Sequence, residues 1–266
     1  MRICPPKRVL LRMQGLDSRT ASAYRSGRLA AVAAGPAHES LNMKLHYHPI
    51  STTSRTVMLF AAESGIPLEM QVVDLFTGEH MQPPYARLNP NRLIPTLEDG
   101  DFVLTENSAI LKYLADKIGS PAYPKDLRQR ARVNERMDWT STQLCSDLVY
   151  GLVYPQIFDS HKRRSDEAQA ATLERSRERA QVWLKVLNDS VLGPGNNYLC
   201  GDSITIADYH AASYVHLAEV IGSDLSAFPN VRQWLARMKS LKSWPQVYSV
   251  IDGFAASLKD KPMLAV

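Results

Sequence analysis

The segment that most constrains the fold of this 266-residue chain is residues 93–105, where an Asp-Gly pair separates two apolar runs. Leu93–Leu97 precedes Asp99-Gly100, and Phe102–Leu104 follows it. Asp-Gly between two such runs favours a tight turn whose backbone twist suits an antiparallel pair of strands. The segment therefore predicts a β-hairpin.

Pro95 is the unusual residue of this hairpin, because proline cannot donate a hydrogen bond to a neighbouring strand. A proline at the start of a strand, beside a ligand cleft, is a position where a cis peptide bond is retained for a reason. Such a bond would leave the backbone of Ile94 free to pair with a peptide ligand as an added strand. The alternative is an edge proline with no function.

The residues around the hairpin complete a small α/β unit. Leu45 and Tyr47 alternate with polar neighbours, which predicts a strand. A buried helix over 55–64, a short strand over 69–75, a polar loop over 76–91 and a helix over 108–117 complete the pattern. A strand–helix–strand unit implies a parallel pair. The order βαβ-ββα is that of a thioredoxin-like domain, expected at 43–119.

The rest of the chain predicts an all-helical domain at 127–260, joined by a linker at 120–126 that contains two prolines. Helices are expected over 127–158, 166–187, 204–220 and 231–241, the last of them ending before Pro245. Thr205 and Asp208 form a capping box at the start of the third helix, where a carboxylate also suits the helix dipole. The fold class is α/β followed by all-α.

Charge separates residues 1–42 from the rest, since they carry seven basic and two acidic residues in a chain of net charge +4. We expect this extension to contribute little to folding, as a disordered tail or an upstream start before Met43, with an organelle transit peptide as the alternative. The remainder is nearly neutral, which does not favour a nucleic-acid partner.

The apolar runs, cysteines and histidines bear on membrane association, cellular compartment and metal binding. No apolar run approaches the ~20 residues of a membrane helix, so no membrane association is expected. The three cysteines are far apart in the sequence, which favours a reducing compartment and a cytoplasmic location, or an organelle if residues 1–42 are a transit peptide. His46 and His48 share a strand face without a third ligand nearby, so no metal is expected.

Three blocks carry a family resemblance: HPISTTSRTVMLFAAESGIPLE, NPNRLIPTLEDGDFVLTENSAILKYLADK and YLCGDSITIADYHAASYV. In this order and spacing they resemble the cytosolic glutathione S-transferases, nearest to theta-like and bacterial serine-type members, over nearly all of 43–250. The resemblance implies a homodimeric detoxification enzyme. Its thioredoxin-like domain would bind glutathione as co-substrate, and its helical domain would line a pocket for a small hydrophobic electrophile.

Ser51 occupies the position where theta-like members keep the serine that hydrogen-bonds the glutathione sulfur. A free thiol has a pKa of ~8.5, and a hydroxyl donor to an anion contributes ~1.5–3 kcal/mol. With a helix N-terminus beside it, the pKa of the bound thiol falls by roughly two units, which makes the nucleophilic thiolate the main form. The alternative role of Ser51 is to cap the helix. Thr52, Thr53 and Ser54 offer further hydroxyls, and Thr52 is included among the expected glutathione-binding residues.

The resemblance also predicts which residues contact the γ-glutamyl and glycyl ends of glutathione. Glu106 and Asn107 lie where the family has an acid and a serine for the γ-glutamyl end, although asparagine is larger than serine. His80 matches a histidine near the glycyl carboxylate, while Leu93 replaces a lysine that many members use there. Ile94 and Pro95 complete the expected set of binding residues.

Two alternatives to a transferase follow from the same fold. One is a non-catalytic binding or regulatory protein, and Ser51 argues against it. The other is a glutathione-dependent disulfide reductase or peroxidase, which needs only bound glutathione. No cysteine lies between Met43 and Thr140, so cysteine-based redox chemistry lacks a nucleophile there.

Overall fold

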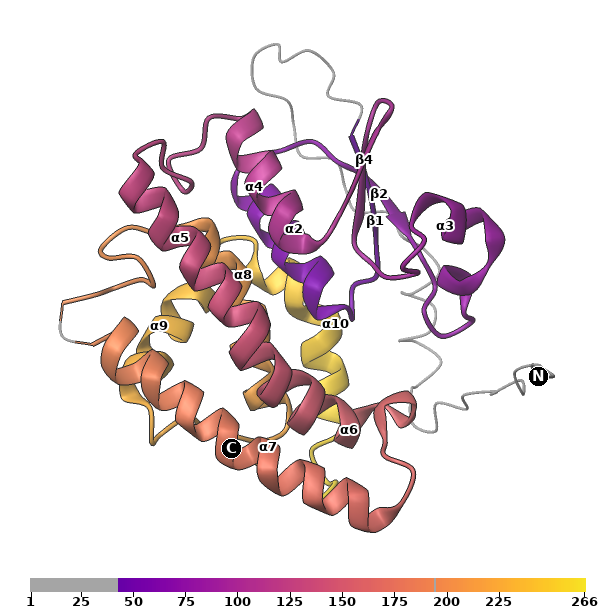
Figure 1. The fold of residues 1–266 in the computed structure, drawn as a ribbon, viewed down its shortest axis with the longest axis vertical. Helices are drawn as coiled ribbons and strands as arrows, with labels where there is room; N and C mark the ends of the chain where they lie inside the picture. Colours follow the sequence, from indigo (N-terminus) through magenta and orange to yellow (C-terminus); the bar gives the residue numbers. More distant parts are fainter. Residues whose placement is uncertain (1–42, 194) are drawn as a thin grey trace.

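The computed structural model describes residues 43–193 and 195–266, so the expectations for residues 1–42 lie outside the described part of the chain. Figure 1 shows a small sheet domain, in indigo to magenta, packed against a larger set of helices in dark red to yellow. The order of elements confirms a thioredoxin-like domain followed by helices.

The sheet has four strands, β1 (Met43–Tyr47), β2 (Glu69–Val72), β3 (Thr96–Asp99) and β4 (Phe102–Thr105). Their order in the sheet is β2-β1-β3-β4, with β1 parallel to β2 and the pairs β1–β3 and β3–β4 antiparallel. This topology confirms both the parallel pair and the hairpin. Gly100 has φ of 63° in the hairpin turn, a backbone conformation that favours glycine.

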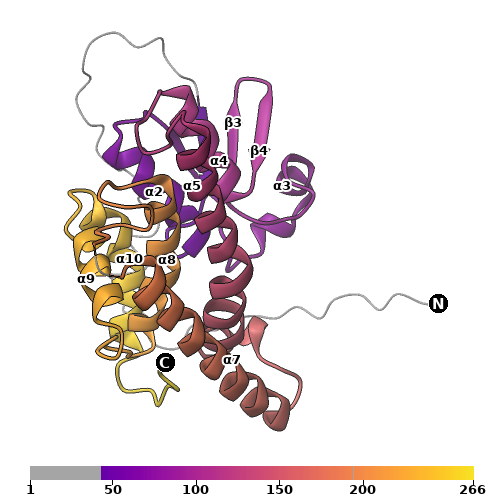
Figure 2. The ribbon, with the colours of Figure 1, turned by 60° about the vertical axis from the view of Figure 1, so that its left-hand side comes forward.

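Helices cover both faces of the sheet. α2 (Thr52–Glu63) and α4 (Asn107–Lys117) lie on the side of the helical domain, and α3 (Pro83–Leu88) lies on the opposite side (Figure 2). α3 and the short 3₁₀ turn η1 (Glu79–Met81) occur within residues 76–91, so the expectation of a plain loop there was wrong. The reason is that Pro83 opens α3: proline at the first helical position lacks only an N–H that would have no partner anyway.

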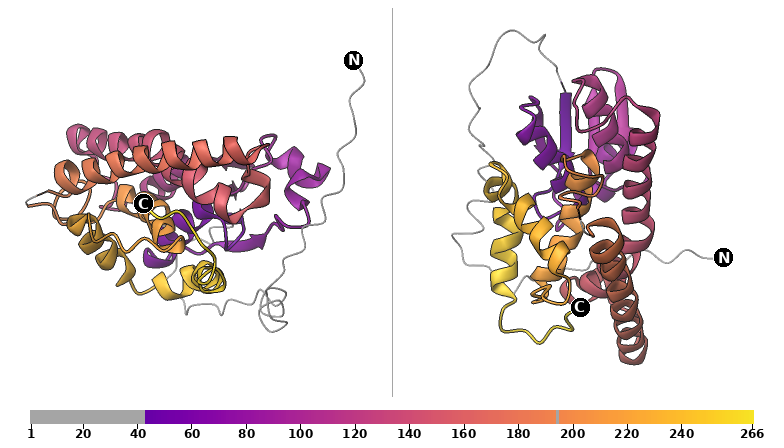
Figure 3. Two further views of the ribbon diagram at one scale, coloured as in Figure 1. Left: turned by 90° about the horizontal axis from the view of Figure 1, so that it is seen from below. Right: turned by 90° about the vertical axis from the view of Figure 1, so that its left-hand side faces the viewer.

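The helical domain begins with one long continuous rod. It consists of α5 (Leu127–Trp139), a segment with π-type hydrogen bonds, η2 (Thr140–Val153), and α6 (Tyr154–Ile157). After η3 (Asp159–His161), α7 (Asp166–Val186) runs back along η2, and η4 (Leu187–Val191) extends it. Figure 3 shows this antiparallel pair on one side of the domain.

Three further helices complete the domain: α8 (Ile206–Val220), α9 (Pro229–Lys239) and α10 (Trp244–Ser257). The expectation that the helix before Pro245 is the last one was wrong, because Pro245 lies in the first turn of α10 rather than after a helix end. α8 is the core of the molecule: it packs on α5, η2, α9 and α10, and also on α2 and α4 of the sheet domain.

The expected capping box is present at the start of α8. The Asp208 carboxylate accepts hydrogen bonds from the backbone N–H and the hydroxyl of Thr205. It also accepts from the backbone N–H of Leu199 and from Nε1 of Trp234 on α9. Asp208 is fully buried, so one carboxylate fixes the entry to α8 and joins it to α9.

Buried contacts also join the two domains. Ala122 and Tyr123 of the expected linker are buried, and the Ala122 carbonyl accepts a hydrogen bond from Ile206 N–H at the start of α8. The side chain of Glu63, at the end of α2, accepts from Ser243 N–H before α10. Within the described residues, no helix is long and apolar enough to cross a membrane.

Candidate active site

The candidate site begins at the turn between β1 and α2, which presents Ser51. Ser51 N–H donates to the carbonyl of His48, and Ile50 N–H donates to Nδ1 of the same histidine. Arg55, fully buried in α2, donates from Nη1 to the Ile50 carbonyl at 2.7 Å. Burial lowers the pKa of His48 to about 4, with Asp74 opposing the shift, so its Nδ1 is a hydrogen-bond acceptor at neutral pH. Local and buried contacts thus fix the position of Ser51.

The four hydroxyls of residues 51–54 differ in what they can reach. Thr52 and Ser54 are 1% and 0% exposed, whereas Ser51 and Thr53 are half-buried. The Thr52 hydroxyl accepts from the Tyr154 hydroxyl at 2.9 Å, so its side chain faces the helical domain. Thr52 is therefore an expected glutathione-binding residue whose hydroxyl is engaged by the helical domain.

Ser51 caps α2, as its position suggests: its Oγ accepts from Ser54 N–H. Its Oγ also lies 3.0 Å from Oγ1 of Thr53, and the Thr53 hydroxyl donates to the carbonyl of Ile94 at 3.0 Å. Capping uses a lone pair of Ser51 and leaves its proton available, so the capping role and the donor role are compatible.

The peptide bond between Ile94 and Pro95 is cis, as the sequence suggested. It lies directly before β3, and the Ile94 carbonyl contacts the start of α2 through Thr53. The predicted hydroxyls and the predicted cis-proline therefore meet at one place in the structure.

Glu106 and Asn107 stand at the start of α4. Glu106 is exposed and has φ of 65°, a left-handed conformation that is uncommon for residues other than glycine. Asn107 is buried, and its amide donates to the hydroxyls of Thr56 and Tyr214. The Thr56 hydroxyl itself donates to the Thr53 carbonyl, so it can only accept from Asn107, which fixes the orientation of the amide. Both N–H donors of Asn107 thus point into the domain interface.

His80 lies in η1, and burial lowers the pKa of its side chain while Asp74 opposes the shift. Its Nδ1 is buried without a hydrogen-bond partner among the described residues. Leu93 is 59% exposed and brings no charge to the site. The structure therefore offers His80 as a neutral donor or acceptor, in an element separate from α2.

A cluster of aromatic side chains lies beside the Ser51 turn, and the sequence interpretation missed it. Tyr150, Tyr154 and Phe158 follow one another at 5.2 and 5.3 Å between ring centroids, and His161 lies 5.0 Å from Tyr154. Phe254 of α10 stacks on Phe158. The spacing of four residues between successive members was the available signal.

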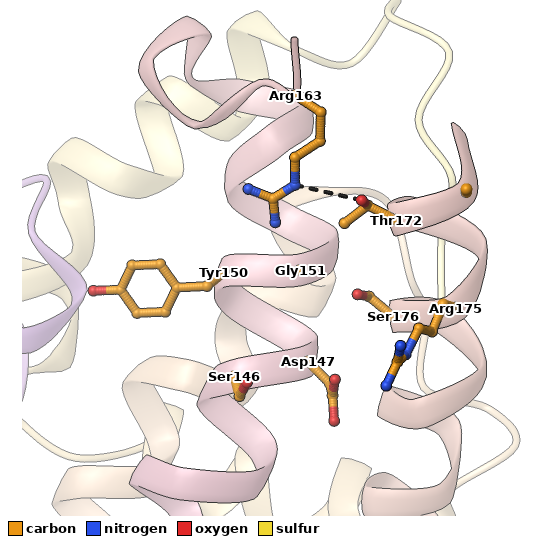
Figure 4. A pocket seen from close by; sticks show the side chains of 9 residues that line it. Ser146, Asp147, Tyr150, Gly151, Arg163, Thr172, Arg175 and Ser176 are labelled. Atoms are coloured by element: carbon orange, nitrogen blue, oxygen red, sulfur yellow. Dashed lines mark hydrogen bonds between the residues drawn. The ribbon is translucent and has the colours of Figure 1, made fainter. Parts of the chain in front are cut away.

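A cavity of about 510 Å³ lies elsewhere, between η2 and α7. Its walls include Asp147, Tyr150, Arg163 and Arg175, and Figure 4 shows the Tyr150 ring extending from η2 on the side away from α7. None of the predicted site residues lines this cavity.

Neither described cysteine has the lowered pKa of a reactive thiol. Burial raises the pKa of Cys145 to about 12 and that of Cys200 to about 11, so both are thiols at neutral pH. No group of three or more His, Cys, Asp or Glu side chains in the described part of the chain is arranged to hold a metal ion.

Comparison with known proteins identifies the class. Residues 50–117 match the family model of the glutathione S-transferase N-terminal domain, and residues 137–242 match that of the C-terminal domain. The chain belongs to the glutathione S-transferase family, and it is an enzyme of that class.

Among its relatives are members of the theta class. Human glutathione S-transferase theta-2 is 33% identical over 204 residues, which cover 75% of this chain and 82% of the relative. Human theta-1 is 33% identical over 207 residues, covering 75% and 83%. The crystal structure of human theta-2 in complex with glutathione and an unknown ligand superposes with a TM-score of 0.71 at 30% identity, covering 84% of this chain and 93% of that one.

Proposed function

We propose that this glutathione transferase uses the Ser51 hydroxyl to stabilise the thiolate of bound glutathione, which then attacks a small hydrophobic electrophile. The observation that carries the proposal is that Ser51 is half-buried at the N-terminus of α2 and keeps a proton not bound to any carbonyl. In the reaction a C–S bond forms, and a leaving group such as halide departs with its electron pair. With an activated alkene, the pair moves onto the substrate and is then protonated.

The electrostatics of the Ser51 turn support this role. The first turn of α2 presents backbone N–H groups, and the buried Arg55 adds a positive charge behind Ile50. A hydroxyl donor to an anion is worth ~1.5–3 kcal/mol, and a helix N-terminus typically ~0.3–1 kcal/mol. Each pKa unit corresponds to ~1.4 kcal/mol, so these donors are sufficient to make the thiolate the main form at neutral pH.

The remaining contacts to glutathione are proposed from the same geometry. The exposed Glu106 carboxylate pairs with the γ-glutamyl ammonium, and the N-terminus of α4 faces the γ-glutamyl carboxylate. Asn107 contributes its backbone N–H, because its amide is engaged in the domain interface. Ile94, held by the cis bond to Pro95, pairs with the peptide backbone, and His80 serves the glycyl carboxylate.

The aromatic cluster supports a hydrophobic electrophile. Tyr150 is 49% exposed, and its ring extends from η2 on the side away from α7 (Figure 4). Tyr154 reaches the residue next to Ser51 through its hydrogen bond to Thr52. Aromatic faces favour flat apolar groups through offset or edge-to-face contact. An electrophile lying on this surface would have its reactive carbon near the sulfur.

We also propose a two-fold homodimer in the cytoplasm with a role in detoxification. The support within the chain is β4, an edge strand that exposes Phe102 and Val103 at 44% and 39%. Exposed apolar side chains on an edge strand favour coverage by a partner. Light scattering at micromolar concentration tests the dimer, and a monomeric mass would contradict it.

Two substitutions test the mechanism, because one should change the pKa of the bound thiol and the other the affinity for glutathione. Ser51→Ala is expected to raise the pKa of the bound thiol and to lower turnover, with little change in glutathione affinity. Glu106→Ala is expected mainly to weaken glutathione binding, by ~1.5–3 kcal/mol if the contact is desolvated. The ultraviolet absorbance of the thiolate against pH, in the binary complex, separates the two effects.

The alternatives from the sequence, a binding protein or a glutathione-dependent reductase or peroxidase, are not favoured by any finding. Conjugation across a small electrophile panel, with glutathione present and absent, tests them. If no electrophile reacts and Ser51→Ala leaves the thiol titration unchanged, the binding protein becomes the better hypothesis.

A further inference from the structure

Thr53 stands between the two parts of the proposed sulfur site. Its Oγ1 lies 3.0 Å from Ser51 Oγ and 3.0 Å from the carbonyl oxygen of Ile94. Ser51 lies at the start of α2, and Ile94 precedes the cis-proline at the start of β3, 41 residues from Thr53. One hydroxyl therefore connects the proposed thiolate donor with the backbone proposed to pair with glutathione.

The direction of these hydrogen bonds follows from counting protons. A carbonyl oxygen only accepts, so the single proton of Thr53 is committed to Ile94. The proton between Ser51 and Thr53 must then come from Ser51. Ser51 Oγ also accepts from Ser54 N–H, so a lone pair of Ser51 is already used. In this structure, the Ser51 proton points at Thr53.

This arrangement has a consequence for catalysis. A hydroxyl has one proton, so Ser51 cannot donate to Thr53 and to a sulfur anion with full strength at the same time. Stabilising the thiolate requires the Ser51 proton to turn from Thr53 Oγ1 to the sulfur. The hydrogen bond to Thr53 is lost in that step, and its loss opposes ionisation of the thiol.

We infer that Thr53 is a positioning residue of the glutathione site: it holds the Ser51 proton in the ligand-free protein and releases it to the thiolate. This inference rests on the proposed role of Ser51. Because Thr53 stays bonded to Ile94 in both states, it remains a competing acceptor throughout the reaction. Thr53 thereby sets how readily glutathione ionises, without touching the sulfur.

Removing the competing acceptor tests the inference. Thr53→Val keeps the shape of the side chain and removes its hydroxyl, so Ser51 has no internal acceptor. We expect the pKa of bound glutathione, read from thiolate absorbance, to fall by about half a unit to one unit, the equivalent of one neutral hydrogen bond. Thr53→Ser keeps both hydrogen bonds and is the matched control, expected to titrate like the unaltered protein.

A double-substitution cycle shows whether Thr53 acts through Ser51. With Ser51→Ala already in place, adding Thr53→Val should leave the pKa of the bound thiol unchanged, because no Ser51 proton remains to compete for. A role limited to holding the Ile94 loop would weaken glutathione binding and leave the thiol titration where it was. An unchanged or raised pKa in Thr53→Val would overturn the inference.

The outcome for the single Ser51→Ala variant separates this inference from the proposed function. If Ser51→Ala raises the pKa of the bound thiol while Thr53→Val does not lower it, Ser51 is the donor and only the role of Thr53 is wrong. If Ser51→Ala does not move the titration, the proposed donor itself is wrong, and the inference falls with it.

Discussion

The buried carboxylate of Asp208 offers the sharpest test of how the helical domain is held together. Its two oxygens accept four hydrogen bonds, at 2.8 Å from Leu199 N–H, 2.9 Å from Trp234 Nε1, 2.8 Å from Thr205 N–H and 2.9 Å from the Thr205 hydroxyl. Burial raises the pKa of Asp208, and these donors act in the opposite direction. Three of the four partners are N–H groups that can only donate, and they contact both oxygens, so each oxygen position requires an acceptor.

The substitution Asp208→Asn keeps the shape and removes one acceptor. If the amide nitrogen replaces Oδ1, Leu199 N–H and Trp234 Nε1 face N–H groups; if it replaces Oδ2, only Thr205 N–H does, because the Thr205 hydroxyl can turn to accept from the amide. A buried donor left without a partner costs about 1–3 kcal/mol, and the less costly orientation leaves one, so we expect a loss of about 1–3 kcal/mol. That is a large part of the ~5–15 kcal/mol that stabilises a typical protein.

Urea unfolding, at one fixed protein concentration, measures the loss as a lower midpoint at unchanged slope. Thr205→Val is the smaller change, because it leaves the carboxylate intact and removes one of its four donors together with the capping hydroxyl. We expect it to cost less than Asp208→Asn. If Asp208→Asn stays within about 1 kcal/mol of the unaltered protein, the carboxylate does not organise the entry to α8, and the reasoning is wrong.

Two further predictions concern stability. Burial lowers the pKa of His48 to about 4 and that of His210 to about 3, so below the ordinary value of 6.5 the unfolded chain binds protons that the folded chain does not. The free energy of unfolding should therefore fall by about 2 kcal/mol per histidine between about pH 7.5 and about pH 5. In urea unfolding, His210→Phe should remove the contribution of His210 to this fall. Gly151→Ala would place a Cβ 2.2 Å from Ser176 Oγ, where η2 meets α7. This overpacking should lower the free energy of unfolding by about 1–3 kcal/mol in thermal unfolding, which outweighs the ~1 kcal/mol that alanine gains over glycine in a helix. Adding Ser176→Gly should recover part of the loss.

The elements that the sequence predicted correctly are those whose partners are close in the chain. The Asp99-Gly100 turn needs only its two flanking strands, and the Thr205–Asp208 capping box spans three residues. Ser51 at the start of α2 belongs to the same group, since the N–H that it caps is three residues away. Such contacts form over a few residues, so local sequence is sufficient to determine them.

Proline accounts for both errors in the predicted fold. Residues 76–91 were interpreted as a loop and Pro245 as the end of the helices, yet Pro83 and Pro245 each lie in the first turn of a helix. Proline interrupts a helix in its interior and suits its first turn equally well. Whether a proline ends one helix or begins the next depends on whether the residues after it form a helix that packs on the rest of the molecule. α10 packs on α2, α8 and α9, a contact that the sequence around Pro245 does not reveal.

The sequence by itself determined the family, the position of the turn that presents Ser51 and the identity of the candidate residues. Tertiary structure alone decided which of those side chains are engaged by contacts within the protein. Thr52 is held by Tyr154, 102 residues away, and the Asn107 amide is held by Tyr214, 107 residues away. The Thr52 hydroxyl accepts from Tyr154 and the Asn107 amide donates to Tyr214, so both side chains are engaged within the protein. Because these partners come from distant segments, the direction of each hydrogen bond is a property of the packed molecule.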